Sequence, residues 1–288
     1  MSFSTTSILV CVSSLLLTQP VFSLDNLSSE QSTVDVQASK NLLQLRERAR
    51  AITVRVIAGR GWGSGILIKK QGQVYTVLTN AHVLRIGSLY QIQTADGRNH
   101  PAKPTGTAQF QDDDLALLSF TSSNNYTLAT ISKSVVVVGD ETFAAGFPDE
   151  QQGFAFTSGR VDYSLAKPFR GGYQIGYSND ILKGMSGGPV LNSRGELVAI
   201  NGKHKHPLWG NSYIFTDGST PVQQIRQQME NSSWAVPVER FLQLAPQFAN
   251  RVAPIPIQQT PNPESIKVEP NERININNKQ PRSQSSFW

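Results

Sequence analysis

From residue 52 onward the sequence repeats one pattern, in which a short apolar stretch ends at a turn signal. Turns are indicated by pairs such as Asp96-Gly97 and Asn124-Asn125. Stretches this short, rich in β-branched and aromatic residues, predict strands rather than helices. Many short strands joined by Gly, Asn and Asp turns predict an all-β protein, either an antiparallel sandwich or a barrel. The predicted strands are residues 52–58, 65–69, 74–79, 89–94, 114–120, 135–138, 141–146, 154–162 and 172–177.

One turn in this series carries a serine among glycines, in the sequence G-M-S-G-G-P that ends at Pro189. Because glycine lacks a Cβ atom, Gly184 and Gly187 let the backbone bend sharply and approach a substrate closely. Successive N–H groups in such a turn can point at one oxygen and stabilise a negative charge that forms there. The simpler interpretation is a glycine-rich turn between two strands. A nucleophilic Ser186 therefore requires a base and an acid elsewhere in the chain.

A histidine and an aspartate stand beside predicted strands upstream of the serine. His82 lies in T-N-A-H-V directly after an apolar stretch, and an imidazole can take a proton from a serine and return it. Asp114 ends a run of aspartates and borders the next apolar stretch, so its carboxylate is expected to be partly buried and to orient an imidazole. A structural histidine and an aspartate-rich turn are the alternatives. Asp112 and Asp113 are interpreted as solvated turn residues.

The order histidine, aspartate, serine is that of the trypsin/chymotrypsin-like serine proteases. The chain resembles this superfamily at T-N-A-H-V around His82, D-L-A-L-L at Asp114 and G-M-S-G-G-P-V around Ser186. The stretch G-W-G-S-G-I-L-I at residues 61–68 resembles the strand that precedes the histidine in these proteases. The similarity covers roughly residues 50–245 and is greatest to bacterial Deg-type peptidases without a PDZ domain. It implies two antiparallel six-stranded Greek-key β-barrels with a C-terminal helix and a cleft between the barrels.

The resemblance also assigns roles to residues of this chain. Ser186 would attack the scissile carbonyl, His82 would act first as base and then as acid, and Asp114 would orient His82. The backbone N–H groups of Gly184 and Ser186 would form the oxyanion hole. Met185 stands where trypsin has the aspartate that pairs with its new N-terminus. A methionine forms no such ion pair, so that activation switch does not carry over.

Substrate-binding residues are also expected on both sides of the serine. Asp180 lies six residues before it, where trypsin carries the aspartate that recognises Lys or Arg. A turn-forming loop aspartate is the alternative interpretation. Ile200, Asn201 and Gly202 are expected to form a strand edge that pairs with the substrate backbone.

Two other functions fit parts of the pattern. G-M-S-G-G also satisfies G-x-S-x-G, the nucleophile elbow of α/β-hydrolases, which requires the order serine, acid, histidine and a helix after the serine. Residues 189–200 instead predict strand, turn and strand, which argues against an esterase. The second alternative is a non-catalytic binding protein on a trypsin-like fold. The presence of all three catalytic residue types argues against it.

The N-terminal sequence and the composition bear on compartment and partners. Residues 8–17 are apolar but short for a membrane span, so residues 1–23 are predicted to be a secretory signal peptide, with a membrane anchor as the alternative. Cys11 is the only cysteine, so its removal would exclude disulfides and thiolate metal sites. We expect a secreted or periplasmic bacterial protein that needs no metal or cofactor. Its expected partner is a polypeptide substrate; the oligomeric state stays open.

A net charge of +5 comes without a dense Lys/Arg patch interleaved with aromatic residues. This distribution argues against nucleic-acid binding. The low charged fraction of 16% accounts for solubility and for loose attraction to anionic surfaces. No stable membrane insertion is expected after signal cleavage.

The expected domain organisation follows from these segments. The N-terminal segment shows near-helical spacing from residue 36, whereas the C-terminal segment is rich in Pro, Asn and Gln and is predicted to be disordered. The predicted order is a signal peptide at 1–23, an N-terminal segment at 24–50, one barrel at 51–125, a second barrel with the helix at 126–250, and the tail at 251–288.

Overall fold

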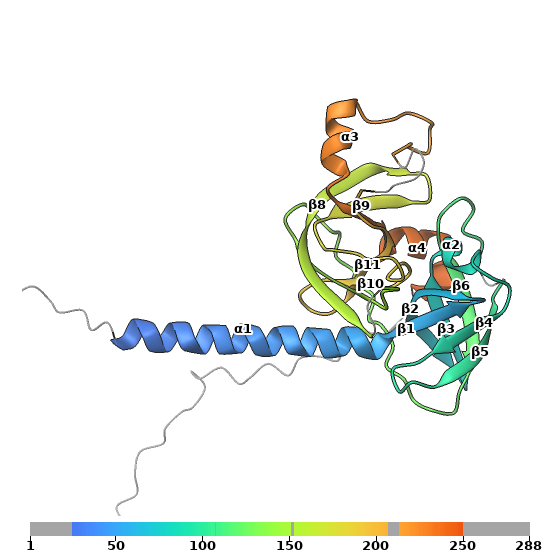
Figure 1. The fold of residues 1–288 in the computed structure, drawn as a ribbon, viewed down its shortest axis with the longest axis horizontal. Coiled ribbons are helices and arrows are strands. Elements are labelled where there is room, and N and C mark those ends of the chain that lie inside the picture. The colour runs from blue at the N-terminus through green and yellow to red at the C-terminus, as the bar shows by residue number, and fades with distance from the viewer. Residues whose placement is uncertain (1–24, 107, 151–152, 207–212, 250–288) are drawn as a thin grey trace, which may run out of the picture. The chain divides into compact units, whose positions relative to one another are not determined.

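The computed structural model describes residues 25–249 except 107, 151–152 and 207–212, with side chains described from residue 37 onward. The predicted signal peptide, with Cys11, and the predicted disordered tail at 251–288 lie outside the described residues. Strands form two closed six-stranded barrels, which are followed by short helices (Figure 1). The prediction of two antiparallel six-stranded barrels with a C-terminal helix is confirmed.

The first barrel is built from β1 to β6 in the order β1-β2-β3-β6-β5-β4, and every pair is antiparallel. The third strand pairs with β6 rather than β4, which is a Greek-key connection. Alternate side chains of β1 and β3, such as Val54, Val56, Tyr75 and Val77, fill the barrel because successive residues of a strand face opposite sides. The strands are β1 (Thr53–Ala58), β2 (Gly61–Gln71), β3 (Val74–Thr79), β4 (Tyr90–Gln93), β5 (Asn99–Pro104) and β6 (Ala116–Thr121), with α2 (Ala81–Leu84) between β3 and β4.

The second barrel has the order β10-β11-β12-β9-β8-β7. The last strand in the sequence, β12, lies between β11 and β9 and pairs with both. The last helix, α4, follows the final strand directly and is the C-terminal helix that the resemblance implies. The elements are β7 (Glu141–Gly146), β8 (Ala155–Phe169), β9 (Tyr173–Tyr177), β10 (Pro189–Leu191), β11 (Leu197–Lys203), α3 (Gln223–Met229), β12 (Ser233–Pro237), α4 (Val238–Leu244) and the 3-10 turn η1 (Pro246–Phe248).

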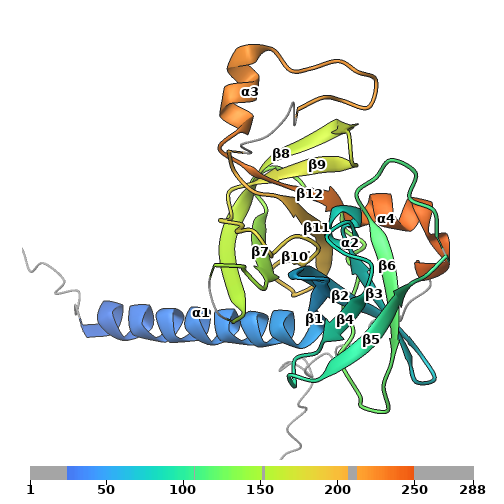
Figure 2. The ribbon, with the colours of Figure 1, turned by 45° about the vertical axis from the view of Figure 1, so that its right-hand side comes forward.

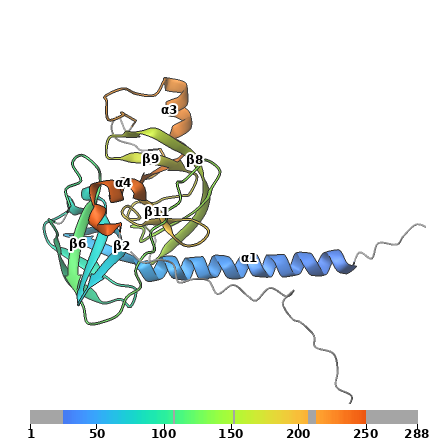
Figure 3. The same ribbon diagram turned by 180° about the vertical axis from the view of Figure 1, so that it is seen from behind.

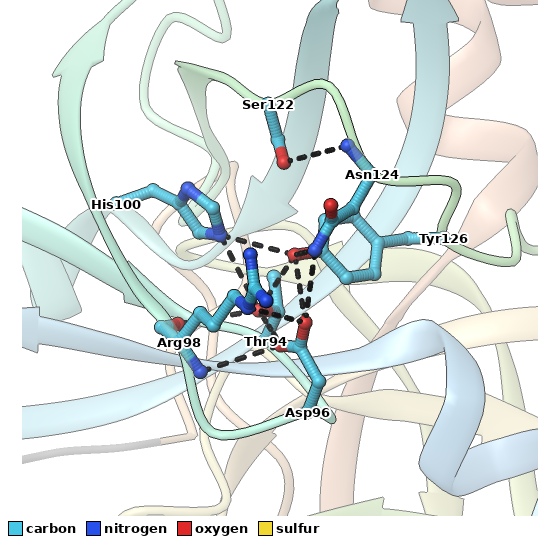
Figure 4. A network of polar contacts seen from close by, with 7 residues as sticks. All are labelled: Thr94, Asp96, Arg98, His100, Ser122, Asn124 and Tyr126. Carbon is cyan, nitrogen blue, oxygen red and sulfur yellow. Dashed lines mark hydrogen bonds and ion pairs between the residues drawn. The ribbon is translucent and has the colours of Figure 1, made fainter.

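Polar side chains fix the start of the connection between the barrels onto the first barrel (Figure 4). The phenol of Tyr126 donates to a carboxylate oxygen of Asp96 at 3.1 Å and lies 3.1 Å from Nε2 of His100. The backbone N–H of Tyr126 donates to the phenol of Tyr75 at 3.0 Å. The predicted boundary between the barrels, between residues 125 and 126, therefore falls in a segment that the first barrel holds in place.

The N-terminal helix α1 (Asp25–Ile52) begins earlier than the helical spacing from residue 36 indicates. Its last turns pack on the domain: Ala49 and Ile52 are buried, and Arg48 donates to the carbonyl of Arg194 at 2.6 Å. Leu43, six residues before Ala49, is 60% exposed. Within residues 25–249, the described helices include none long and apolar enough to cross a membrane.

The barrels meet along a shared apolar cluster, with α4 at the junction (Figures 2 and 3). Leu78 and Leu117 of the first barrel and Ile200 of the second belong to this cluster, together with Phe241 of α4. Arg240 of α4 also reaches the loop before β6. Burial at this junction brings the ends of β3, β6, β9 and β11 to one place. The candidate active site lies there.

Candidate active site

The pairing of β3 with β6 brings His82 and Asp114 together. Thr79 is opposite Ala116 in this pair, so the one-turn helix α2 after β3 starts beside the residues that lead into β6. Nδ1 of His82 lies 2.6 Å from Oδ2 of Asp114, and the His82 backbone N–H donates to Oδ1 at 2.8 Å. The side-chain amide of Asn80 holds the Asp114 carbonyl at 2.7 Å. One carboxylate therefore holds His82 at two points, its backbone N–H and its imidazole.

Tyr173, which the sequence analysis did not identify, gives Asp114 a further partner from the second barrel. Its phenol donates to the same Oδ2 that receives His82. Burial favours protonation of Asp114, but the hydrogen bonds and charge of His82 and the hydrogen bond from Tyr173 outweigh it and hold the pKa of Asp114 below its ordinary value of 3.8. Burial and the Asp114 charge raise the pKa of Tyr173 well above 10, so the phenol keeps the proton that it donates.

Gly202 makes room for this tyrosine. A Cβ atom at Gly202 would lie 2.2 Å from Cε1 of Tyr173 and 2.6 Å from its phenol oxygen. On the next residue, the Lys203 ammonium lies 4.4 Å from the centre of the Tyr173 ring. Burial lowers the pKa of Lys203, although the Asp114 carboxylate opposes that shift. Tyr173 thus contacts two charged groups at the barrel junction: its phenol donates to the Asp114 carboxylate, and its ring faces the Lys203 ammonium.

Ser186 lies on a backbone turn between β9 and β10. Gly184 and Gly187 have φ angles of +93° and +83°, which residues with a side chain rarely adopt. The N–H groups of Met185, Gly187 and Gly188 donate to carbonyls of the protein. In the described part of the chain, those of Gly184 and Ser186 have no acceptor. They are free to stabilise an oxyanion.

The Ser186 hydroxyl donates to the carbonyl of Gly202 at 3.2 Å. No hydrogen bond joins it to His82 among the described residues. His82, Tyr173 and Gly202 line one pocket of about 530 Å³, into which both barrels contribute side chains. Catalytic hydrogen bonds are often long in proteins without substrate and shorten when substrate binds.

Asp113 differs from the expected solvated turn residue. It is buried, and its carboxylate accepts a hydrogen bond from Nε of Arg240 on α4 at 2.6 Å. A buried carboxylate requires such a partner, because an uncompensated charge in the interior is costly. The interpretation of Asp113 as solvated was therefore wrong, whereas Asp112 is exposed.

The predicted substrate-binding residues occupy different environments. Asp180 is 81% exposed and forms an ion pair with Lys205 at 2.6 Å. Both residues line a pocket of about 750 Å³ that Met185 also lines. Both backbone groups of Asn201 are bonded inside the protein and are not open to a substrate. Its N–H donates to the Gly188 carbonyl and its C=O accepts from the Gly187 N–H, both at 2.9 Å.

Of the three strand residues, Gly202 lines the pocket that contains His82, and Ile200 is buried in the apolar cluster. The described residues contain no group of three or more His, Cys, Asp or Glu side chains able to hold a metal ion.

Comparison with known proteins connects this geometry to a family. Residues 63–200 match the family model described as a trypsin-like peptidase domain. The chain is 35% identical over 176 residues to the periplasmic serine endoprotease DegP of Salmonella typhimurium. The aligned region covers 58% of this chain and 35% of the relative. It is 32% identical over 176 residues to a probable periplasmic serine endoprotease, DegP-like, of Buchnera aphidicola, with the same two coverages.

A crystal structure of the serine endoprotease from Yersinia pestis is similar in fold, with a TM-score of 0.53 and 22% identity over 72% of this chain and 66% of that one. The chain spans about a third of the length of the curated relatives named above.

Proposed function

We propose that this chain, whose residues 63–200 match the family model of a trypsin-like peptidase domain, is an exported serine endopeptidase that acts through an acyl-enzyme. The observation that carries the proposal is the doubly hydrogen-bonded pair of His82 and Asp114, at 2.6 and 2.8 Å, beside the Ser186 turn. A carboxylate held at Nδ1 leaves Nε2 of the imidazole as the basic atom. This pairing supports His82 as the base and Asp114 as its orienting acid, with Ser186 as the proposed nucleophile.

In the proposed reaction Oγ of Ser186 attacks the carbonyl carbon of the substrate while Nε2 of His82 takes the hydroxyl proton. The ionised Asp114 stabilises the imidazolium that forms. The N–H groups of Gly184 and Ser186 bind the oxyanion. His82 then gives the proton to the leaving amine, and a water activated by His82 hydrolyses the acyl-enzyme.

The hydroxyl of Ser186 has to turn before this reaction. It donates to the Gly202 carbonyl at 3.2 Å, so this bond has to break before the hydroxyl can give its proton to the imidazole. Staggered rotamers of a serine exchange easily, so such a movement needs no change in the backbone. We infer that an extended substrate lying along Gly202 competes for that carbonyl and releases the hydroxyl.

Localisation and substrate class rest on the relatives and on the sequence. The relatives are named as periplasmic endoproteases, and residues 1–23 have the pattern of a secretory signal, so we propose a periplasmic or secreted protein that cleaves polypeptides. Asp180 is the candidate for attracting a Lys or Arg side chain. Its pairing with Lys205 means that a cationic substrate would compete with an internal cation.

Labelling with a fluorophosphonate tests the proposal. Such a probe forms a covalent bond with an activated serine, so wild-type protein should be labelled and Ser186→Ala should not. Ser193→Ala, which removes an exposed serine from the following turn, is the matched control and should be labelled like wild type. Folded wild-type protein that takes up no label would contradict the protease and favour the non-catalytic binding protein. Labelling that persists in Ser186→Ala would contradict this nucleophile.

A further inference from the structure

Ser64 of the first barrel contacts the serine turn of the second barrel through both its backbone and its side chain. Its backbone N–H donates to the carbonyl of Ser186 at 2.8 Å. Its hydroxyl donates to the carbonyl of Gly184 at 2.8 Å and accepts from the N–H of Phe147 at 2.9 Å. The side chain is completely buried, so no water competes for these bonds. One serine thus links β2 to two separate segments of the second barrel.

Neighbouring residues pack closely around Ser64. A Cβ atom at Gly146 would lie 2.8 Å from the Ser64 hydroxyl oxygen. A Cβ atom at Gly187 would lie 2.2 Å from the Ser64 carbonyl oxygen. The same carbonyl accepts the hydroxyl of Thr79 at 2.7 Å. Because the hydroxyl accepts from the Phe147 N–H in this packed setting, its own proton is donated to the Gly184 carbonyl.

Gly184 needs an external anchor because a glycine at φ +93° imposes little conformational restriction of its own. The peptide group before Gly184 is held by one hydrogen bond, in which the Asp149 N–H donates to the Lys183 carbonyl at 2.8 Å. The peptide group after it is held by the Ser64 hydroxyl. Since C=O and N–H point in opposite directions in a trans peptide, fixing the Lys183 carbonyl fixes the direction of the Gly184 N–H.

Ser64 also supports the segment that carries Asp149. It accepts the Phe147 N–H, and the indole N–H of Trp62, two residues earlier on β2, donates to the Phe147 carbonyl at 3.1 Å. Arg55 lies between the two rings, 5.1 Å from that of Trp62 and 5.0 Å from that of Phe147. The first barrel therefore holds both peptide groups next to Gly184, one directly and one through residues 147–149.

We propose that Ser64 is a positioning residue for the oxyanion site: its hydroxyl, bonded to the Gly184 carbonyl and the Phe147 N–H, keeps the Gly184 N–H directed at the reacting carbonyl. This role rests on the proposed peptidase function. It concerns the transition state and not the binding of substrate, because the oxyanion forms only during reaction.

Ser64→Ala tests the role through a division between rate and binding. We expect kcat for a peptide substrate to fall about 10- to 100-fold with KM nearly unchanged. A peptide aldehyde forms a tetrahedral adduct with an active serine, so its affinity should fall by a similar factor. Trp62→Phe removes the second hydrogen bond to the 147–149 segment and should give a smaller loss of the same kind. It provides the test if Ser64→Ala does not fold.

Thr53→Val is the matched control. Thr53 is also completely buried in the first barrel, and its hydroxyl donates to the Ala49 carbonyl at 2.6 Å. It should lower stability without changing kcat or aldehyde affinity. Unchanged kcat in folded Ser64→Ala, or an equal loss in Thr53→Val, would overturn the role while leaving the peptidase in place. A wild-type protein that neither cleaves peptides nor binds the aldehyde would remove the peptidase itself.

Discussion

The two barrels contribute to the site in different ways. The first barrel supplies the side chains of His82 and Asp114, and the carboxylate of Asp114 holds His82 through two hydrogen bonds. The second supplies a backbone turn around Ser186, which is fixed by glycines that pack against neighbouring backbone, as at Gly187 and Gly188. We call His82 and Asp114 the side-chain half of the site and the Ser186 turn the backbone half. A substitution in the side-chain half can change one atom or one proton and keep the shape, whereas the backbone half has no space for an added Cβ atom. The halves should therefore respond to mutation in different ways.

The largest effect should come from Asp114→Asn, which alters the side-chain half chemically and leaves its shape. An amide cannot stabilise the imidazolium and favours the wrong tautomer, so we expect kcat to fall by about four orders of magnitude with the fold retained. Steady-state kinetics and circular dichroism measure the two quantities. Asp113→Asn is the control. It changes the neighbouring residue in the same way but removes the negative charge that pairs with Arg240, so it should cost stability but not kcat. A comparable loss of kcat in both variants would contradict the distinction.

Gly187→Ala should damage the backbone half through sterics. Its Cβ atom would lie 2.2 Å from the carbonyl of Ser64 and 2.3 Å from the hydroxyl of Thr79. With a φ of +83° in addition, we expect the free energy of unfolding to fall by about 4 kcal/mol. Gly97→Ala has a similar φ of +81° with nothing within 4 Å, so it should cost only about 1–2 kcal/mol. Equal losses in urea denaturation would show that φ, and not the contact, decides.

Tyr173→Phe should give the smallest effect, because it removes one hydrogen bond where the halves meet. We expect kcat to fall about tenfold. The pKa of Asp114 is below 3.8 in the folded protein, so its ionised form stabilises the fold above that pH, and this stabilisation is lost as the pH falls through the lower folded-state pKa. Without the phenol, the pKa should move back toward 3.8. The midpoint of acid unfolding should therefore rise.

Tyr75→Phe is the control for this comparison. It removes a buried phenol that donates to the Asn124 carbonyl at 2.8 Å in the first barrel. It should lower stability at every pH without changing the acid dependence that Asp114 causes. If the pH midpoint of acid unfolding moves no further in Tyr173→Phe than in Tyr75→Phe, the Tyr173 phenol does not lower the pKa of Asp114.

Local sequence patterns were sufficient for most strands and for the motifs at His82, Asp114 and Ser186. Two strand predictions were wrong: residues 135–138 form no strand, and β5 (Asn99–Pro104) was not predicted. Contacts distant in sequence were not visible in those patterns. Tyr173 reaches Asp114 across 59 residues, and Ser64 reaches Gly184 across 120.

The same reason explains the error at Asp113, whose partner is 127 residues away on α4. A run of aspartates alone is typical of a solvated turn. The early start of α1 was missed because residues 24–35 lack the apolar periodicity that predicts a helix.

The position of β12 has a consequence for synthesis. Residues Ser233–Pro237 pair with both β9 and β11, so the second barrel cannot close until they have been made. The Ser186 turn lies between β9 and β10 and depends on that closure for its support. A nascent chain that already contains all three proposed catalytic residues is therefore still without an assembled site. The strand order therefore makes assembly of the proposed site depend on a strand that ends at Pro237, 51 residues after Ser186 in the sequence.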